Sequence, residues 1–144
     1  MINEPLVSIV ITNFNRLQDL KETIYRTDDI KYKSKEIIIV DSGSHDGSPE
    51  FIQGLDDRKY LKILLPKNKG SAFSHNQGMK AAKGEFVVTI DDDCYLHPDV
   101  ISLAVDVFKA NKNLSGLGFG FVNPNTEVDN SKYNAEQKFL SFFF

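Results

Sequence analysis

Residues 85–99 read EFVVTIDDDCYLHPD, and this stretch decides the fold because it joins a hydrophobic run to a cluster of charge. Its first six residues are typical of a buried β-strand. Asp91, Asp92 and Asp93 follow directly. Three carboxylates at one strand end repel one another, and each resists ionising beside the others. The cluster therefore requires either polar partners or a cation.

The composition of the whole chain limits the classes of function. Its 144 residues are 41% hydrophobic and 26% charged, with a net charge of −3, so no global basic surface for nucleic acid is expected. Cys94 is the only cysteine, which fits a reducing compartment. No basic leader precedes the first apolar run, and no stretch approaches the roughly 20 apolar residues of a membrane span. We therefore expect a cytoplasmic location, which includes the inner face of the membrane.

Apolar runs alternate with amphipathic segments along the chain. This alternation favours an α/β fold with a mostly parallel sheet and helices on both faces. The predicted strands are 6–12, 36–40, 60–65, 85–90 and 116–122, and the Phe-rich tail, 123–144, is interpreted as a sixth strand or a helix. The predicted helices are 16–28, a short one with Ser48 as N-cap, 71–82 closed by Gly84, and one that starts at Pro98 and ends at Asn111 or Asn113.

Polar residues cluster where the predicted strands end. Ligands of parallel α/β sheets bind outside the carboxyl ends of the strands, so these side chains are expected to converge on one rim. Those after the first two strands are Thr12, Asn13, Asn15, Asp41, Ser42 and Gly43, and those after the third and fourth are Asn68, Lys69, Gly70, Asp91, Asp92 and Asp93.

The acidic cluster has two interpretations. A carboxylate after a strand can simply form a turn or cap a helix, and we interpret Asp99 beside Pro98 in that way. Alternatively, hard carboxylate oxygens suit Mg²⁺ or Mn²⁺, which proteins hold through one or two carboxylates together with substrate phosphates. His45, His75 and His97 have no partner at the spacing of zinc ligands.

Two further loops also allow a structural and a functional reading. VDSGSHDGSP (40–49) contains turn-forming pairs, or else Asp41 accepts hydrogen bonds from a base or sugar while Gly43 lets the ligand approach. The second loop is NKGSAFSHNQG (68–78). In the structural interpretation it only connects a strand to a helix, and in the functional one its lysine, glycines and helix N-terminus bind an anionic group.

Four segments, in this order, resemble glycosyltransferase family 2. The resemblance spans about residues 6–122 and implies the GT-A type fold, whose nucleotide-binding half is Rossmann-like. The segments are VSIVITNFNR, EIIIVDSGSHDGS, NKGSAFSHNQGMKAAKGEF and VVTIDDDCYLHPD. Together they form a specific pattern, although each one alone is weak.

The resemblance implies a role for individual residues. Asp93 is the expected main ligand of Mn²⁺ or Mg²⁺, and Asp91 and Asp92 are expected to contact the ribose and orient the ion, with Asp91 as the second metal ligand. Asp41 is expected to meet the base. The predicted nucleotide-sugar site consists of Thr12, Asn13, Asn15, Asp41, Gly43, Gly70, Asn76, Asp91 and Asp92.

The implied activity is transfer of a sugar from a nucleotide diphosphate to the hydroxyl of a glycan, lipid or protein, with inversion of configuration at the sugar. The expected donor is a UDP-sugar. Two features depart from the family pattern. His75 stands where members often carry Arg, and the chain ends at Phe144, before the family's acceptor half and catalytic base. We therefore expect a single truncated domain over 1–144 and name no base.

Two other functions stay open at this point. A non-catalytic module could bind a nucleotide sugar or a partner without transferring anything. A sugar nucleotidyltransferase is a second alternative, but its basic, Gly-rich loop is missing from TNFNRLQD (12–19). The Phe-rich tail is also expected to promote self-association if its normal partner is absent.

Overall fold

The structure is a computed structural model and describes residues 4–118. The chain divides into two compact units, Met1–Ser102 and Leu103–Phe144. The prediction of one domain over 1–144 stays a prediction. Across residues 4–118, every helix is too short or too polar to cross a membrane.

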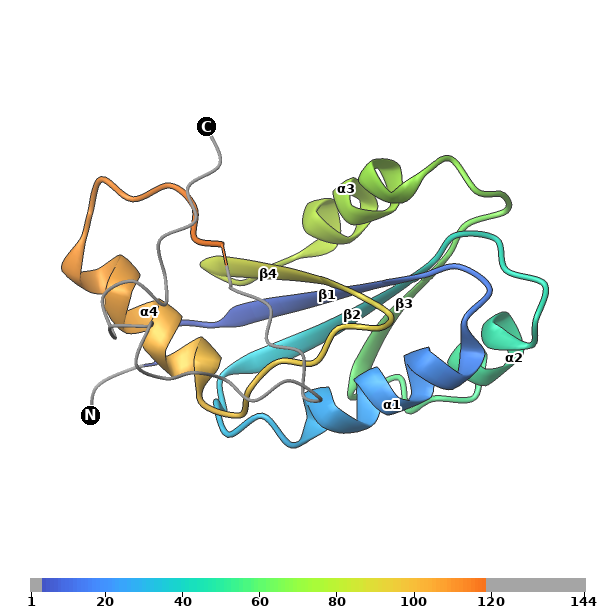
Figure 1. The fold of residues 1–144 in the computed structure, drawn as a ribbon, viewed down its shortest axis with the longest axis horizontal. Helices are drawn as coiled ribbons and strands as arrows, with labels where there is room; N and C mark the ends of the chain where they lie inside the picture. The colour runs from blue at the N-terminus through green and yellow to red at the C-terminus, as the bar shows by residue number, and fades with distance from the viewer. Residues whose placement is uncertain (1–3, 119–144) are drawn as a thin grey trace, which may run out of the picture. The chain divides into compact units, whose positions relative to one another are not determined.

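The first unit is built on a parallel sheet of four strands in the order β3-β2-β1-β4 (Figure 1). This confirms the predicted α/β class. The strands are β1 (Val7–Asn13), β2 (Lys35–Asp41), β3 (Tyr60–Leu64) and β4 (Phe86–Asp91). The helices are α1 (Leu17–Asp28), α2 (Ser48–Gln53), α3 (Ser71–Ala81) and α4 (Val100–Ala110), the last of which crosses the boundary between the two units.

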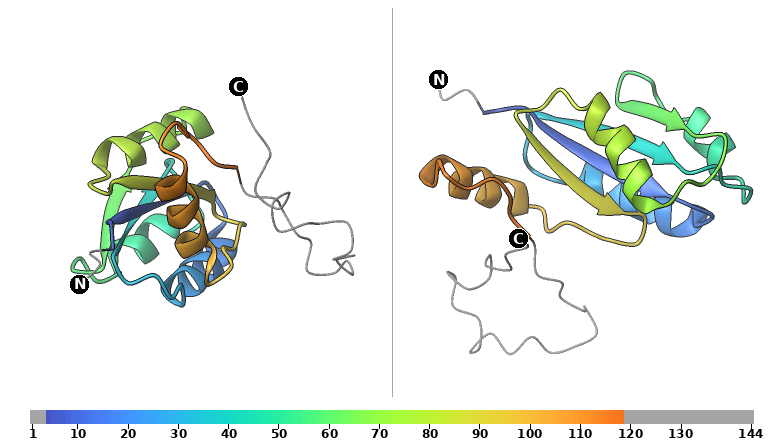
Figure 2. Two further views of the ribbon diagram at one scale, coloured as in Figure 1. Left: turned by 90° about the vertical axis from the view of Figure 1, so that its left-hand side faces the viewer. Right: turned by 90° about the horizontal axis from the view of Figure 1, so that it is seen from above.

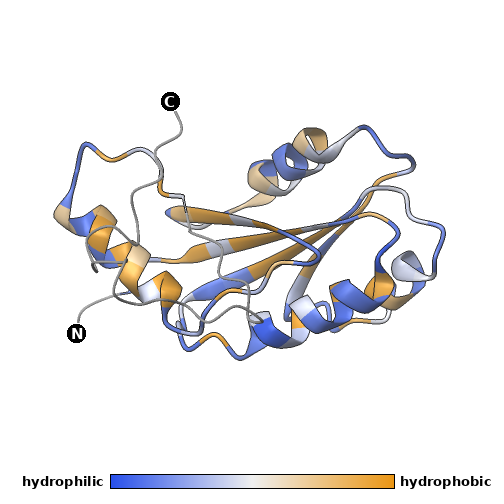
Figure 3. Ribbon diagram, in the orientation of Figure 1, coloured by the Kyte–Doolittle hydropathy of each residue, from blue (hydrophilic) through white to orange (hydrophobic). Residues whose placement is uncertain are grey.

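Strand β1 lies at the centre of the sheet and sets the position of the site. It pairs in parallel with β2 on one side and β4 on the other, and all seven of its residues are buried. Figure 3 shows the hydrophobic strands as the orange centre of this unit. In the register, Asn13 stands opposite Asp41 and Thr12 opposite Asp91. The polar ends of three strands are therefore level with one another.

Helices cover both faces of the sheet (Figure 2). Helix α3 lies on one face, and α1 and α2 lie on the other (Figure 1). Helix α1 buries Leu20 and Ile24, as its predicted spacing requires. Helix α3 approaches the sheet unusually closely at Gly78, because a Cβ there would lie 2.2 Å from Cγ1 of Val10. No larger residue fits this contact without a shift of the helix.

Three local predictions need correction. Within the described residues, strand β4 is buried on one face only: Val88 and Ile90 are buried, whereas Val87, on the other face, is 41% exposed. The N-cap of α2 is Gly47, with φ +89°, and Ser48 is the first helical residue. Gly84 is not a left-handed cap, since α3 ends at Ala81 and the residue after it, Ala82, is extended. Glycine is needed there because a Cβ would lie 2.6 Å from the backbone nitrogen of Ser8.

The remaining predictions fall at the end of the chain. Helix α4 ends at Ala110 and Asn111 follows it, as predicted. The predicted strand at 116–122 is absent from residues 116–118, and its remainder lies outside the described residues. The Phe-rich tail, 123–144, and the self-association expected of it also lie outside them.

Candidate functional site

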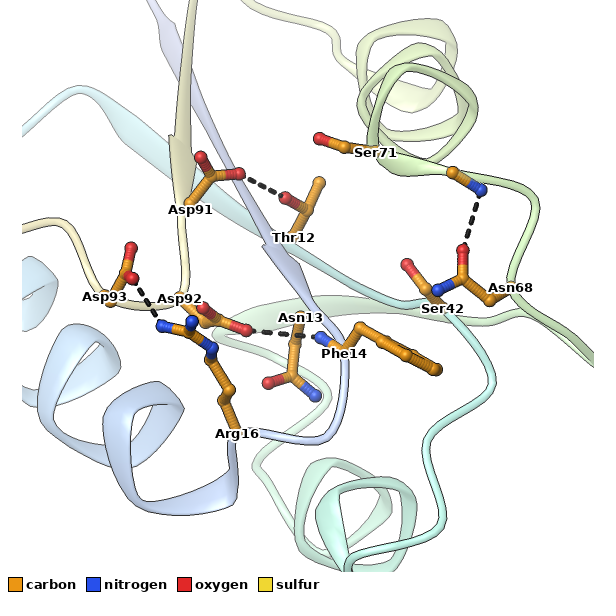
Figure 4. A pocket seen from close by; sticks show the side chains of 11 residues that line it. Thr12, Asn13, Phe14, Arg16, Ser42, Asn68, Ser71, Asp91, Asp92 and Asp93 are labelled. Carbon is orange, nitrogen blue, oxygen red and sulfur yellow. Dashed lines mark hydrogen bonds and ion pairs between the residues drawn. The ribbon is translucent and has the colours of Figure 1, made fainter.

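A cavity of about 380 Å³ opens at the carboxyl ends of the strands. Its size is within the range of small-molecule sites. Figure 4 shows carboxylates from the end of β4 on one side, the start of α3 on the other, and the end of β1 between them. The lining residues are Thr12, Asn13, Phe14, Arg16, Ser42, Asn68, Gly70, Ser71, Asp91, Asp92 and Asp93.

Asp91 faces the cavity from the last position of β4. The hydroxyl of Thr12 donates to its Oδ1 over 3.1 Å. The Nε2 atom of His75 on α3 lies 3.3 Å from the Thr12 hydroxyl oxygen and 3.6 Å from Oδ1 of Asp91. Three elements therefore fix the direction of this carboxylate, while its side chain stays 58% exposed and can take a ligand.

Asp92 also lines the cavity, but it is largely buried. It is only 7% exposed, and its Oδ2 accepts the backbone N–H of Phe14 over 3.2 Å. The Thr23 hydroxyl donates to its carbonyl over 2.5 Å, which ties β4 to α1. Burial raises the pKa of the Asp92 carboxyl, although the Phe14 N–H and the charge of Arg16 act against that shift. Asp92 therefore holds the loop after β1 in place.

Asp93 is exposed and pairs with a cation from the loop after β1. Its Oδ2 lies 2.5 Å from Nη1 of Arg16 (Figure 4). Arg16 occupies the N-cap position of α1 but gives that helix no side-chain cap. The three adjacent carboxylates thus have three different environments: Asp91 faces the cavity, Asp92 is buried, and Asp93 is paired on the surface.

A buried polar network lies behind the cavity. Asp41 is fully buried, and its carboxylate accepts hydrogen bonds from Asn13, Gly43 and Ser44. The Nδ2 atom of Asn13 donates to Asp41 over 2.8 Å, whereas its Oδ1 is buried without a partner within the described residues. An unsatisfied buried acceptor is costly. Asp41 therefore orients the amide of Asn13, a residue that also lines the cavity.

Four predicted site residues do not line the cavity: Asn15, Asp41, Gly43 and Asn76. Gly43 has a close neighbour in the chain itself, because a Cβ there would lie 2.7 Å from Cα of Lys67. The approach of a ligand to Gly43 stays a prediction. Asn15 accepts the N–H of His45 and belongs to the loop framework. Asn76 is exposed on α3. The contact predicted between Asp41 and a base stays a prediction.

The loop that holds Asp41 also caps two helices. Asp46 Oδ2 accepts the backbone N–H of Leu17, the first residue of α1, over 2.8 Å. Its Oδ1 accepts the N–H and the hydroxyl of Ser48 at the start of α2. Asp46 therefore has the structural role that the turn interpretation of this loop predicts, because it links the starts of α1 and α2.

The start of α3 forms the side of the cavity opposite the carboxylates. Gly70 has φ +90°, and a Cβ there would meet no atom within 4 Å, so its open face adjoins the cavity. Its N–H donates to Oδ1 of Asn68 over 2.7 Å. The eleven-residue helix begins with Ser71 and has no acidic residue in its first turn. Its N-terminal N–H groups and dipole favour an anion.

The chemistry of these residues fits a divalent cation only in part. Asp91 and Asp93 supply exposed carboxylate oxygens at one edge, which suit Mn²⁺ or Mg²⁺. Within residues 4–118 no three His, Cys, Asp or Glu side chains come close enough to hold a metal by themselves. An ion at this edge would need further oxygen ligands from water or from a bound molecule such as a diphosphate.

Three lining residues, Phe14, Arg16 and Ser71, are not among those predicted from the sequence. Phe14 and Arg16 belong to the NFNR segment at the end of β1. The strand-end rule that selected Asn13 and Asn15 covered them, but only amide and hydroxyl side chains were chosen. An aromatic and a cationic side chain at a strand end are equally strong signals for a ligand with a base and a phosphate.

A family model and the curated relatives both identify this chain with glycosyltransferases. The model of glycosyl transferase family 2 matches residues 8–143. The poly-beta-1,6-N-acetyl-D-glucosamine synthase of Staphylococcus aureus (strain COL) is 27% identical over 112 residues, which are 77% of this chain and 27% of that protein. The cholesterol galactosyltransferase of Borreliella burgdorferi is 30% identical over 114 residues, covering 78% and 32%. The chain thus spans about a third or less of these relatives.

Solved structures share the fold. The mannosyltransferase PcManGT from Pyrobaculum calidifontis, in complex with GDP-Man and Mn²⁺, superposes with a TM-score of 0.66 at 24% identity, covering 74% of this chain and 33% of that one. TarS of S. aureus, in complex with UDP-GlcNAc, gives a TM-score of 0.66 at 20% identity, covering 74% and 32%. At these identities the similarity shows the fold alone.

Proposed function

The chain belongs to glycosyl transferase family 2, and on that premise we propose that its first unit binds the nucleotide-diphosphate sugar donor of an inverting glycosyltransferase. The observation that carries the proposal is the cavity between the carboxylates after β4 and the N-terminus of α3. One side suits a cation and the other an anion. A diphosphate with its divalent counterion needs both.

The diphosphate is assigned to the centre of the cavity. Asp93 and Asp91 are the residues proposed to hold Mn²⁺ or Mg²⁺, and phosphate oxygens would complete its coordination. The open face of Gly70 and the first turn of α3 are proposed to meet the phosphates from the opposite side. The complex of a neighbour with GDP-Man and Mn²⁺ supports this choice of ligand classes.

The base is assigned to the loop after β1. Phe14 is 40% exposed at the cavity, although an aromatic ring of this size is normally buried. A flat ring at the edge of a polar cavity is a stacking surface for a nucleobase. Asn13 lines the same cavity, and its Oδ1, which has no partner within the described residues, is proposed to accept a hydrogen bond from the ligand. A uridine nucleotide is the proposed donor, as in the UDP-GlcNAc complex of a neighbour.

The reaction follows from this placement. When bound, a divalent cation supplies positive charge that stabilises the departing diphosphate. The helix α3 N-terminus adds fixed partial charge on the other side. Asp91, with its direction fixed by Thr12, is proposed to orient both the ribose and the ion. An acceptor hydroxyl would attack from the open side of the cavity, and we assign no residue as its base.

Calorimetric titration tests the donor site. UDP, GDP and their sugar derivatives are titrated into the protein with and without Mn²⁺. We expect at least one nucleotide to bind, and to bind more tightly with the metal. Asp93→Asn should remove that metal effect, whereas Asp99→Asn, an exposed carboxylate paired with Lys31, should not. If no nucleotide binds in either condition, the proposal is wrong.

Transfer itself is a separate proposal, because the relatives are much longer. Incubating the protein with the donor that binds, with and without a glycan or lipid acceptor, measures released nucleoside diphosphate. Release that depends on the acceptor supports transfer. Binding without release would favour the non-catalytic module, and pyrophosphate formed from a nucleoside triphosphate would favour the nucleotidyltransferase.

A further inference from the structure

The ion pair between Arg16 and Asp93 occupies the carboxylate that the proposed function assigns to the metal. Nη1 of Arg16 lies 2.5 Å from Oδ2 of Asp93, and both side chains line the cavity. The two side chains are 51% and 48% exposed. Such an exposed pair is weak, because solvent screens the charges and the long side chain loses rotamer freedom. It can therefore be exchanged for a better partner.

Arg16 and a divalent cation compete for Asp93. The guanidinium pairs with Oδ2 of Asp93, which leaves Oδ1 for a metal, and its positive charge repels a cation at the same edge. Asp91 offers a second carboxylate, although its Oδ1 already accepts the Thr12 hydroxyl. In the absence of an anionic ligand, Arg16 should therefore weaken metal binding.

A bound diphosphate changes this balance. Arg16 lines the same cavity, and its planar guanidinium can form paired hydrogen bonds with phosphate oxygens. A bound nucleotide thus offers Arg16 a second anionic partner when the metal binds the Asp93 carboxylate. Rotation of one exposed side chain is sufficient for this exchange, and the buried loop contacts of Asp92 need not change.

We propose that Arg16 is an exchangeable counterion, which pairs with Asp93 in the free protein and moves to the diphosphate when metal and nucleotide bind together. The inference rests on the proposed function. It makes the metal and the nucleotide bind cooperatively, since each favours the arrangement that the other needs. Its distinctive consequence is that Arg16 has opposite effects on the two ligands.

The test compares Arg16→Gln with the original protein. Electron paramagnetic resonance of free Mn²⁺ measures metal binding alone, and calorimetry with UDP in saturating Mn²⁺ measures nucleotide binding. We expect Arg16→Gln to bind Mn²⁺ alone about 2–5-fold more tightly, because an exposed counterion is lost. We expect it to bind UDP with metal about 10-fold more weakly, because a charge-assisted hydrogen bond to phosphate is lost.

Arg26→Gln is the matched control. Arg26 also forms an exposed ion pair, with Glu22 over 2.7 Å, but it lies outside the cavity lining. It should change neither affinity. In an Asp93→Asn background, Arg16→Gln should no longer improve Mn²⁺ binding, because the carboxylate for which the two cations compete is gone.

The outcomes separate the inference from the proposed function. If the original protein binds UDP with Mn²⁺ but Arg16→Gln shifts both affinities in the same direction, or neither, the exchange is wrong and the donor site stands. Opposite shifts, with the gain in Mn²⁺ affinity lost in the Asp93→Asn background, support the exchange. If the original protein binds neither Mn²⁺ nor UDP, both the inference and the proposed function are overturned.

Discussion

Replacing Gly78 with alanine tests how closely α3 must pack for the site to exist. The added Cβ would lie 2.2 Å from Cγ1 of Val10 and 3.1 Å from Cγ2 of Val40. Carbon atoms pack at about 3.5–4.0 Å, so the first contact is too short by more than 1 Å. Val10 cannot yield, because it is fully buried, β-branched and on the central strand. Helix α3 must therefore move outward.

The expected cost comes from two opposing terms. Overpacking a buried site costs about 1–3 kcal/mol, and the severity of this overlap places Gly78→Ala at the upper end. Alanine is a better helix former than glycine by about 1 kcal/mol. The free energy of unfolding should therefore fall by about 2 kcal/mol. Nucleotide affinity should fall as well, because Gly70 and Ser71 at the start of α3 line the cavity.

Gly54→Ala is the matched control for the same chemical change. Gly54 has φ −74°, and a Cβ there would lie 3.5 Å or more from its neighbours. This variant should be unchanged or more stable by up to about 1 kcal/mol. Urea denaturation followed by far-ultraviolet circular dichroism measures both variants, since the chain contains no tryptophan. A Gly78→Ala protein as stable as the original would refute the packing argument.

Two further predictions follow from the loops around the site. Asp46→Ala removes the cap of both α1 and α2 and should lower the free energy of unfolding by about 1–2 kcal/mol at neutral pH. Burial by itself would raise the pKa of the Asp46 carboxyl, but hydrogen bonds from Ser48 and the Leu17 N–H lower it overall. The stability that Asp46 contributes is therefore present above the ordinary carboxyl pKa of about 3.9, and it is lost as the pH falls through the lowered pKa of the folded protein. The urea denaturation curves of the original protein and Asp46→Ala should therefore converge on acidification. A difference in stability that stays constant with pH would contradict this. Phe14→Ala should weaken UDP binding about 10-fold, because the stacking surface for the base is lost, whereas Phe14→Tyr should keep the affinity. Calorimetry measures the affinities. Equal affinities for the original protein and both variants would exclude a base at Phe14.

The sequence was sufficient for the sheet because its signals are local and strong. The apolar runs that became β1 and β2 are bounded by polar residues, and parallel pairing brings their ends level. The same rule brought Thr12, Asn13, Gly70 and the three aspartates to one cavity. The apolar residues of β4 predict burial on both faces, but burial of a face depends on which elements pack against it, and the strand's own sequence does not report that.

The finer arrangement of the site depends on contacts between distant segments. The three aspartates are adjacent and chemically equal in sequence, yet Phe14 and Arg16 give Asp92 and Asp93 different partners. Gly43 must be glycine because the backbone at Lys67, 24 residues later, lies where a Cβ would be. Neither contact leaves a local pattern, so only the folded chain could assign these roles.

Paramagnetic broadening by Mn²⁺ in the presence of UDP locates the bound metal directly. In amide NMR spectra of the labelled protein, Asp91, Asp93 and the first turn of α3 should broaden first. The amide of Lys35, at the amino end of β2, should stay sharp, and Asp93→Asn should abolish the pattern. Broadening that is centred elsewhere, or that is unchanged by Asp93→Asn, would contradict a metal–diphosphate site at the carboxyl ends of these strands.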